Sequence, residues 1–306
     1  MLNADHIREY RDAYSIDGNL AALRYSSRKA TDGNSLRPDI RIVTYNEVDS
    51  TNMRVKEDRA DCDYCVHTAL IQTQGYGRQG RSWTSPLGGL YASLGINLAS
   101  YIPVPLRDDI STLSLVVGLS VKAALERVSN LASQAIQIKW PNDVLVHDAK
   151  ICGISLELFN TTFLCIGVGI NVIRDEVGGY DGKYRYAYAC EGIHRAGTEL
   201  SAHHALFMEK LLGCFLAEFE RRFVVWLEKG FTPFVEPFNA SLAWKERLVA
   251  IERIDGVRLD SGIIVRVTER GTLLLANPDN PYQNPQEVAS GEVHFLPLEQ
   301  NSGLLV

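Results

Sequence analysis

The chain has 306 residues, of which 46% are hydrophobic, and a formal net charge of −6. This length allows one large domain or two to three smaller ones, each with a real hydrophobic core. The negative charge argues against broad, non-specific binding to nucleic acid, which needs a basic surface. The longest apolar stretches, such as residues 164–172, are too short to span a bilayer, and the first residues do not resemble a signal peptide. We therefore expect a soluble cytoplasmic protein that binds neither nucleic acid nor membrane.

The six cysteines are scattered along the chain, which is unlike the dense spacing of a disulfide scaffold, and we expect reduced thiols. Cys62 and Cys65 form a lone Cys-x-x-Cys pair near His67. A structural zinc site needs four ligands, and no second pair has matching spacing, so we favour a pair without function. The adjacent His203 and His204 are expected at the surface or in a helix cap.

The predicted elements follow in chain order. Residues 1–41 form an N-terminal arm with a weak helical pattern near residues 7–23. A strand at 40–48 ends at Asp49-Ser50-Thr51-Asn52, whose side chains suit the cap of a helix that begins near Met53. Strands are predicted over 65–72 and 90–98. The spacing of apolar residues then predicts an amphipathic helix over 111–128, capped by Ser111.

Alternating apolar residues predict a strand at 136–139, followed by a Pro-Asn-Asp turn and by two strands joined as a hairpin through residues 160–161. Residues 178–197 read as a loop. Ser201 caps a long helix that ends at Gly230, and its stripe of aromatic residues indicates core packing. Short strands separated by Asp-Gly, Ser-Gly and Arg-Gly pairs after residue 239 suggest a small β-barrel.

This order predicts an α+β fold with a mixed or antiparallel sheet. We expect three parts: the arm at 1–41, a ligand-binding domain at 42–240 and a C-terminal domain at 241–306. No internal repeat or low-complexity segment is visible.

The densest chemistry lies in the run Lys139-Trp140-Pro141-Asn142-Asp143. Pro141 fixes its own φ and favours an extended Trp140, so the chain should turn at once and present Asn142 and Asp143 at a strand end. Binding sites are commonly built at such ends. Pro, Asn and Asp also favour turns for backbone reasons alone, and the run by itself does not separate the two interpretations.

A second cluster extends from Gln72 to Trp83 and contains Gly75-Tyr76-Gly77-Arg78-Gln79-Gly80. The run matches Gly-x-Gly-x-x-Gly, but a dinucleotide site needs a helix after it, and here another strand follows. No P-loop motif occurs. The cluster instead reads as a flexible glycine loop whose Arg78 and Arg81 can hold phosphate or carboxylate.

Together, the two clusters describe a pocket for a nucleotide and a second acid. Lys139 and Lys150 add two cations, Asp143 a carboxylate, and Gly153 allows close approach of a ligand. These groups suit attack of a carboxylate on an α-phosphate, because cations neutralise the charge that develops.

With these motifs in place, the chain resembles biotin protein ligases, also called biotin–[acetyl-CoA-carboxylase] ligases, over about residues 42–300. The resemblance rests on five segments in the correct order: 49–52, 72–83, 139–143, 150–153 and Gly167-Val-Gly-Ile-Asn171. It implies a class II synthetase-like catalytic domain followed by an SH3-like β-barrel domain.

The resemblance also implies a two-step reaction. Biotin and Mg-ATP give biotinyl-5′-AMP and pyrophosphate, and a lysine of a biotin carboxyl carrier domain then attacks the acyl carbon. The implied ligands are ATP, Mg²⁺ and biotin as a substrate, and the implied partner is the carrier domain of a biotin-dependent carboxylase. A homodimer is possible in such a family.

Residue roles follow from the matching positions. Binding of biotin is expected of Ser50, Thr51, Asn52, Gln72, Gly75, Tyr76, Arg78, Lys150, Gly153 and Gly169. Binding of the nucleotide is expected of Arg78, Arg81, Trp83, Asn142, Lys150 and Asn171. Catalytic roles are expected of Arg78, Lys139, Asp143 and Lys150, and the metal ligands stay unassigned.

The chain departs from the family at two places. Tyr76 stands where the family usually carries Arg, which removes one cation from the loop. The first forty residues are too short for the DNA-binding winged helix of many bacterial members, so we expect a ligase without repressor function. Two alternatives stay open: a lipoate ligase or octanoyltransferase of the same fold, and a non-catalytic biotin sensor or regulator.

Overall fold

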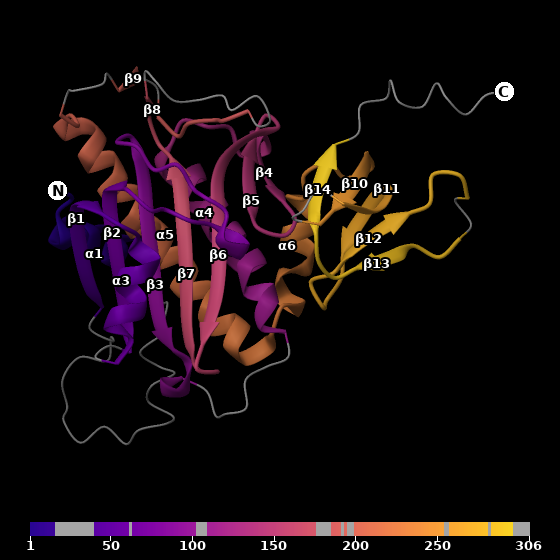
Figure 1. Cartoon of the computed structure of the whole chain (residues 1–306), viewed down its shortest axis with the longest axis horizontal. Coiled ribbons are helices and arrows are strands. Elements are labelled where there is room, and N and C mark those ends of the chain that lie inside the picture. Colours follow the sequence, from indigo (N-terminus) through magenta and orange to yellow (C-terminus); the bar gives the residue numbers. More distant parts are fainter. Residues whose placement is uncertain are drawn as a thin grey trace.

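The structure is a computed structural model that describes residues 1–15, 40–60, 63–101, 109–175, 185–190, 193–194, 199–253, 257–280 and 283–295. Two sheets dominate it, one in the centre of the molecule and one in its C-terminal part (Figure 1). A further pair of two-residue strands, β8 (Arg174–Asp175) and β9 (Ile193–His194), is parallel.

The first sheet has seven strands in the order β1-β2-β3-β7-β6-β5-β4. Its strands are β1 (Arg41–Val48), β2 (Tyr64–Gln72), β3 (Gly89–Asn97), β4 (Ile136–Lys139), β5 (Asp143–Val146), β6 (Ala149–Phe159) and β7 (Phe163–Asn171). Only the pair β1 and β2 is parallel, and helix α3 (Thr51–Glu57) lies in the connection between them. Every other neighbouring pair is antiparallel, which confirms the predicted α+β fold with a mixed sheet.

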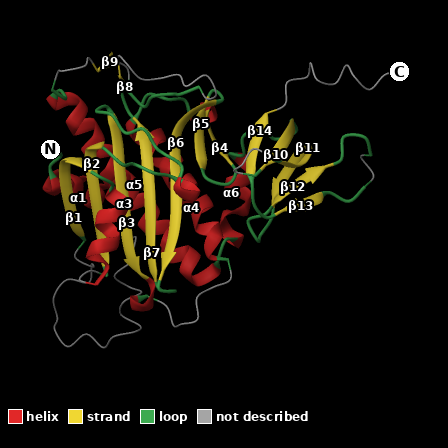
Figure 2. Cartoon of the chain, viewed as in Figure 1, coloured by secondary structure: helices red, strands yellow, loops and turns green. Residues whose placement is uncertain are grey.

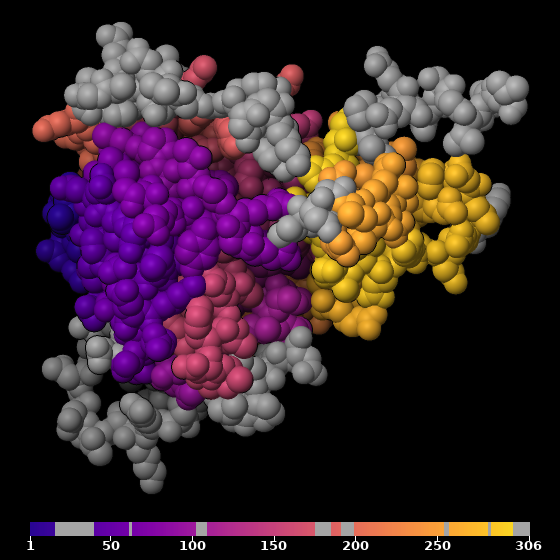
Figure 3. All heavy atoms as spheres, in the orientation of Figure 1, coloured from indigo at the N-terminus to yellow at the C-terminus, as the bar shows by residue number. Residues whose placement is uncertain are grey.

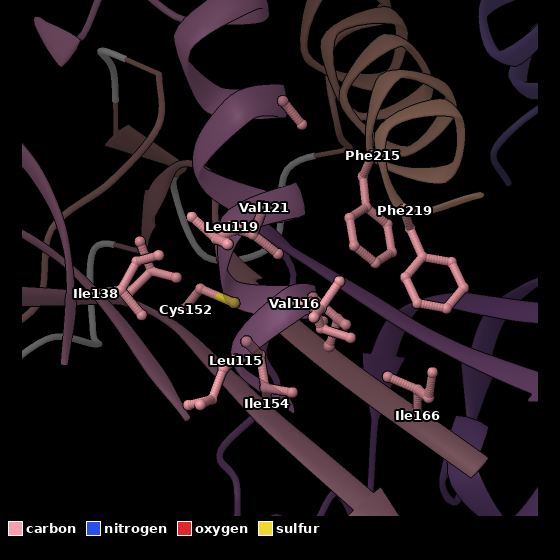
Figure 4. Packing of buried hydrophobic residues seen from close by; sticks show 14 of the residues in the cluster. Leu115, Val116, Leu119, Val121, Ile138, Cys152, Ile154, Ile166, Phe215 and Phe219 are labelled. Carbon is pink, nitrogen blue, oxygen red and sulfur yellow. The ribbon is translucent and has the colours of Figure 1, made fainter. Parts of the chain in front are cut away.

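Helices α4 (Leu113–Val128) and α5 (Ala202–Lys229) cover one face of this sheet, and α3 lies on the other (Figure 2). Apolar side chains from both helices and from the strands form one continuous core beneath them (Figure 4). The aromatic stripe of α5 lies in this core, where the rings of Phe215, Phe219 and Phe223 stack at centroid distances of 6.1 and 5.3 Å. The stripe is therefore core packing, as its spacing predicts.

Helix α1 (Ala4–Tyr14) shares this core and packs against α5. The two helices cross closely at Gly213, where an added Cβ would lie 2.7 Å from the Ile7 carbonyl oxygen. Nearby, the Arg11 Nε donates to Glu220 Oε1 at 2.7 Å, and both side chains are buried. The described part of the N-terminal arm is therefore joined to α5 by apolar packing and by a buried ion pair.

The second sheet has five antiparallel strands in the order β13-β12-β11-β10-β14 and follows the short helix α6 (Val235–Ala240). Its strands are β10 (Leu248–Glu252), β11 (Arg258–Val267), β12 (Leu273–Ala276), β13 (Gln286–Val288) and β14 (Glu292–Phe295). Within the described ranges, β13 and β14 do not pair, so hydrogen bonds do not close the predicted SH3-like barrel. The sheet lies against one end of the central part (Figure 3), and Trp140 Nε1 donates to the Gly271 carbonyl oxygen across this contact at 2.8 Å.

Several local expectations need correction. The chain does not stay in a turn at Asp143 but begins β5 there, and β13 and β14 are further strands that the sequence pattern did not reveal. A 3₁₀ turn at Ile110–Thr112 precedes α4, so Ser111 is not its cap. Ser201 does cap α5, since its hydroxyl accepts from the His204 backbone N–H. Cys62 lies outside the described residues.

No helix in the described ranges is long and apolar enough to cross a membrane.

Candidate active site

Strand register places two rows of side chains on the face of the central sheet that α4 and α5 do not cover. Cross-strand partners point to the same face, and residues two apart along a strand share it. The longer row reads Tyr91, Gly169, Gly153, Asp143 and Lys139 across β3, β7, β6, β5 and β4. The shorter row, two residues away, reads Ser93, Gly167 and Ser155. Glycines in the middle of both rows leave a hollow in the sheet that a ligand can enter.

One end of this hollow is lined by small polar side chains. The backbone N–H and the hydroxyl of Thr51 both donate to Gln72 Oε1, at 2.9 and 3.0 Å. The Ser93 hydroxyl lies 2.7 Å from Thr51 Oγ1 and 2.6 Å from Asn52 Oδ1, and the Asn52 amide donates to Ser155 Oγ at 3.2 Å. Because amides and hydroxyls carry both donors and acceptors, this network can recognise a polar, uncharged group.

The glycine loop folds over the hollow. It is held by two internal hydrogen bonds of 2.8 Å, from Trp83 N to the Gly75 carbonyl oxygen and from Gly77 N to the Arg81 carbonyl oxygen. The Trp83 indole lies directly on the glycine pair of the sheet. A Cβ added to Gly153 or Gly169 would lie 2.7 Å from a ring atom. The sheet therefore needs glycine at both positions to seat this ring.

We expect Gly169→Ala to displace the Trp83 ring, because real Cβ atoms do not approach other heavy atoms to 2.7 Å. The indole N–H resonance of Trp83, assigned with a Trp83→Phe variant, should shift in the NMR spectrum. Gly77→Ala is the matched control, since its added Cβ would meet only the Arg81 carbonyl oxygen, at 4.0 Å. An unchanged Trp83 resonance in Gly169→Ala would contradict the packing described here.

At the other end of the hollow, a buried carboxylate lies between two lysines. Asp143 Oδ1 is 2.8 Å from Lys150 Nζ, and its Oδ2 is 3.7 Å from Lys139 Nζ. Burial raises the pKa of Asp143, but the two ammonium groups outweigh burial and hold the pKa below its ordinary value. Burial lowers the pKa of Lys139, which Asp143 only partly offsets. Lys150 Nζ also lies 5.0 Å from the centroid of the Trp83 ring.

The two arginines of the glycine loop connect it to two other parts of the molecule. Arg78 Nη1 donates to Asn142 Oδ1 at 2.9 Å, in the turn between β4 and β5. Arg81 forms an ion pair with Glu292 at the start of β14. Partial burial raises the pKa of Glu292, but the His294 imidazole 3.7 Å away and the guanidinium of Arg81 outweigh burial and bring the pKa to about 2. The C-terminal sheet therefore contributes a charged wall to the hollow.

This ion pair predicts how stability changes in acid. A carboxyl whose pKa falls from 4.5 in the unfolded chain to about 2 in the folded one stabilises the fold above pH 4.5. The stabilisation is lost as the pH falls through about 2. We expect Glu292→Gln to be less stable than the wild type at neutral pH and the difference to shrink between pH 4.5 and 2, as measured by urea unfolding. A difference that stays constant over this range would contradict the ion pair.

Most of the residues predicted for the site line this hollow, whose volume is about 1100 Å³ including space open to solvent. The lining members of the predicted set are Thr51, Asn52, Gln72, Tyr76, Arg78, Arg81, Trp83, Lys139, Asn142, Asp143, Lys150, Gly153 and Gly169. Three predicted residues lie beside it. Ser50 precedes α3, Gly75 lies at the base of the loop, and the Asn171 amide donates to the Lys150 carbonyl oxygen at 3.2 Å.

The hollow is also lined by residues that were not predicted from the sequence, among them Tyr91, Ser93, Ser155, Gly167, Tyr186 and Glu292. Ser155 and Gly167 lie two positions from the predicted Gly153 and Gly169 on the same strands, so strand alternation could have revealed them. Glu292 gave no such signal, because its strand belongs to the second sheet.

Comparison with known proteins gives a consistent result. Residues 46–171 match the Biotin/lipoate A/B protein ligase family. The chain is 37% identical over 139 residues to the bifunctional ligase/repressor BirA of Salmonella typhimurium, which covers 42% of this chain and 40% of BirA. It is 28% identical over 232 residues to a biotin–[acetyl-CoA-carboxylase] ligase of Paracoccus denitrificans, which covers 74% of this chain and 88% of that protein.

Among solved structures, the biotin protein ligase of Aquifex aeolicus in complex with biotin and ATP matches with a TM-score of 0.63 and 27% identity, over 83% of this chain and 97% of that one. The match to biotin–protein ligase 1 of Arabidopsis thaliana covers 55% of that protein's length. The matched segment contains the strands and the glycine loop that build the hollow. Over residues 46–171, the chain is therefore similar to the biotin/lipoate A/B protein ligase family.

Proposed function

We propose that the protein is a biotin–protein ligase, which joins biotin to a lysine of a biotin carboxyl carrier domain with consumption of ATP. The observation that carries the proposal is a single hollow with a neutral polar end and a cationic end, bridged by the glycine loop. A ligand with a polar head group and a carboxylate fits these two ends. We also propose that residues 42–240 form the catalytic domain and residues 241–306 a second domain that completes the site.

In the first step, a carboxylate oxygen of biotin attacks the α-phosphorus of ATP. The bond from this phosphorus to the bridging oxygen breaks, and pyrophosphate leaves. Arg78, Arg81 and Lys150 carry the positive charge that lines the loop side of the hollow, and such charge stabilises the oxygens on which negative charge develops. Trp83 and Asn142 are positioned to contact the nucleotide.

In the second step, the amine of the carrier lysine attacks the acyl carbon of biotinyl-5′-AMP. The bond from the acyl carbon to the phosphate oxygen breaks, AMP leaves, and the new amide nitrogen loses a proton. We assign Asp143 to orient the incoming amine, because a carboxylate whose pKa is held low stays ionised and can accept a hydrogen bond from it. Lys139 in turn holds Asp143 in place.

Mg²⁺ would neutralise the phosphates of ATP when bound. The described residues contain no group of three or more His, Cys, Asp or Glu side chains that could hold a metal ion. Mg²⁺ commonly takes one or two carboxylates and completes its shell with phosphate oxygens and water. Glu292 and Asp143 are the carboxylates that line the hollow, so we propose that the nucleotide supplies most of the ligands.

The polar end of the hollow supports biotin over lipoate or octanoate. Thr51, Asn52 and Ser93 are buried there, and a purely apolar ligand tail would leave their amides and hydroxyls facing carbon. The ureido group of biotin offers two N–H donors and a carbonyl acceptor instead. Lipoate ligation is therefore the second candidate function, and biotin ligation is the preferred one.

The direct test is to incubate the protein with ATP, magnesium, biotin and a carrier domain, and to measure the mass of the carrier. We expect one lysine to gain the mass of biotin minus water. Parallel reactions with lipoate and octanoate test the alternative, and reactions without ATP test the energy source. Modification by lipoate and not by biotin, or no modification of any carrier, would overturn the proposal.

A further inference from the structure

Lys56 forms a cluster with Tyr76, Glu157 and Phe159 next to the hollow. Its Nζ donates to Tyr76 Oη at 2.5 Å and to Glu157 Oε2 at 2.7 Å. The same ammonium lies 5.0 Å from the centroid of the Tyr76 ring and 4.5 Å from that of Phe159. Lys56 thus binds the glycine loop through Tyr76 and binds β6 through the other two residues.

Two observations show that Lys56 acts on the loop and not on an anionic ligand. Glu157 neutralises its charge at contact distance, and Lys56 is absent from the lining of the hollow, whereas Tyr76 is part of it. Partial burial lowers the pKa of Lys56, but the hydrogen bonds to Glu157 and Tyr76 outweigh this effect, so the pKa is raised and the ammonium persists. The charged Lys56 therefore holds the first half of the glycine loop, at Tyr76, against β6, at Glu157.

Three side chains of the loop tip reach other parts of the molecule. Arg78 reaches Asn142, Arg81 reaches Glu292, and Tyr76 reaches Lys56. The first two use the guanidinium groups that an anionic ligand would engage, so binding competes with them. The Tyr76 contact uses a neutral phenol and does not compete. It can therefore persist when the loop holds a ligand.

We propose that Lys56 is a positioning residue that fixes Tyr76 and so keeps the glycine loop closed over the bound adenylate. This inference rests on the proposed function and adds a determinant of adenylate retention. Loss of the Lys56 ammonium removes a charge-assisted hydrogen bond, which is equivalent to roughly tenfold to a hundredfold in an equilibrium. The loss should appear in how fast biotinyl-5′-AMP escapes and in the KM for biotin, and much less in kcat.

The experiment compares Lys56→Met and Tyr76→Phe with the wild type. Radiolabelled biotinyl-5′-AMP is formed on each protein, and its release is followed after a chase with unlabelled biotin. We expect release to be about tenfold faster in both variants. The double variant should release no faster than Lys56→Met alone, because the two residues act through one contact. Lys56→Arg should restore slow release, and Lys229→Met, an exposed change at the end of α5 that is absent from the lining of the hollow, should match the wild type.

The outcomes separate the two proposals. A wild type without biotin-dependent ATP–pyrophosphate exchange would overturn the proposed function itself. An active wild type whose Lys56→Met and Tyr76→Phe variants release adenylate at the wild-type rate would overturn the role of Lys56 alone. A fall in kcat with unchanged release and unchanged KM would also overturn it, because that pattern describes a group acting on the reacting atoms. If Lys56→Met does not fold, Tyr76→Phe removes only the hydroxyl and decides the question.

Discussion

Lys150→Ala is expected to lower biotin-dependent ATP–pyrophosphate exchange by about 10²- to 10³-fold, the size of effect seen when one charge-stabilising group is removed from an active site. The Lys150 ammonium lies 2.8 Å from Asp143 and 5.0 Å from the centroid of the Trp83 ring. The variant therefore loses a cation from the end of the hollow that would hold the phosphates of ATP and the carboxylate of biotin. Arg78→Ala should have an effect of the same order, because it removes a guanidinium from the loop that covers the hollow.

Lys229→Ala is the control for this series, since Lys229 is exposed at the last position of α5 and does not line the hollow. Lys150→Met keeps most of the aliphatic stem and separates loss of charge from loss of packing. Exchange at the wild-type rate in both Lys150→Ala and Arg78→Ala would refute the catalytic roles assigned to them.

Arg11→Ala is expected to lower the free energy of unfolding by about 3–5 kcal/mol, because it leaves a buried carboxylate without its partner. Arg11 and Glu220 are only 6% and 3% exposed, and their 2.7 Å contact joins α1 to α5. The loss can be measured from urea unfolding curves of the two proteins.

Arg8→Ala offers a matched control on the same helix. Arg8 pairs with Asp5 at the surface, where an ion pair contributes about 0–1 kcal/mol. Similar losses of unfolding free energy in Arg11→Ala and Arg8→Ala would show that the buried pair stabilises the fold no more than the surface pair does. A double change of Arg11 to Met and Glu220 to Leu should recover much of the stability, since it removes both charges together.

The sequence predicted much of the central fold because its signals are local. The apolar spacing of α4, the cap at Ser201 and the alternation at 136–139 are each set by neighbours along the chain. The site clusters were visible for a related reason. The glycine loop at 72–83 carries two arginines, and the run from Lys139 to Asp143 carries a cation, an amide and a carboxylate. Together, these groups exceed what an ordinary turn or strand needs, so both clusters could be picked out before the strand register was known.

The parts that could not be predicted depend on strand pairing or on contacts between distant segments. β5 begins inside a run that local preferences mark as a turn, and its pairing with β4 and β6 reveals it. Ser93 looks like an ordinary strand residue until the register places it beside Gly167. Glu292 lies on a four-residue strand whose place against the glycine loop depends on how the second sheet docks. No residue near Glu292 in the sequence carries that information.

The participation of β14 in the hollow also bears on how the protein acquires activity as it folds. The lining begins at Thr51 and ends at Val293, so nearly the whole described chain must be in place before the hollow is complete. Contacts of such large sequence separation form late and slowly. A nascent chain still emerging from the ribosome would have its glycine loop but not the β14 wall. Under the proposed function, such an unfinished chain should therefore lack the complete site that forms and holds the acyl-adenylate.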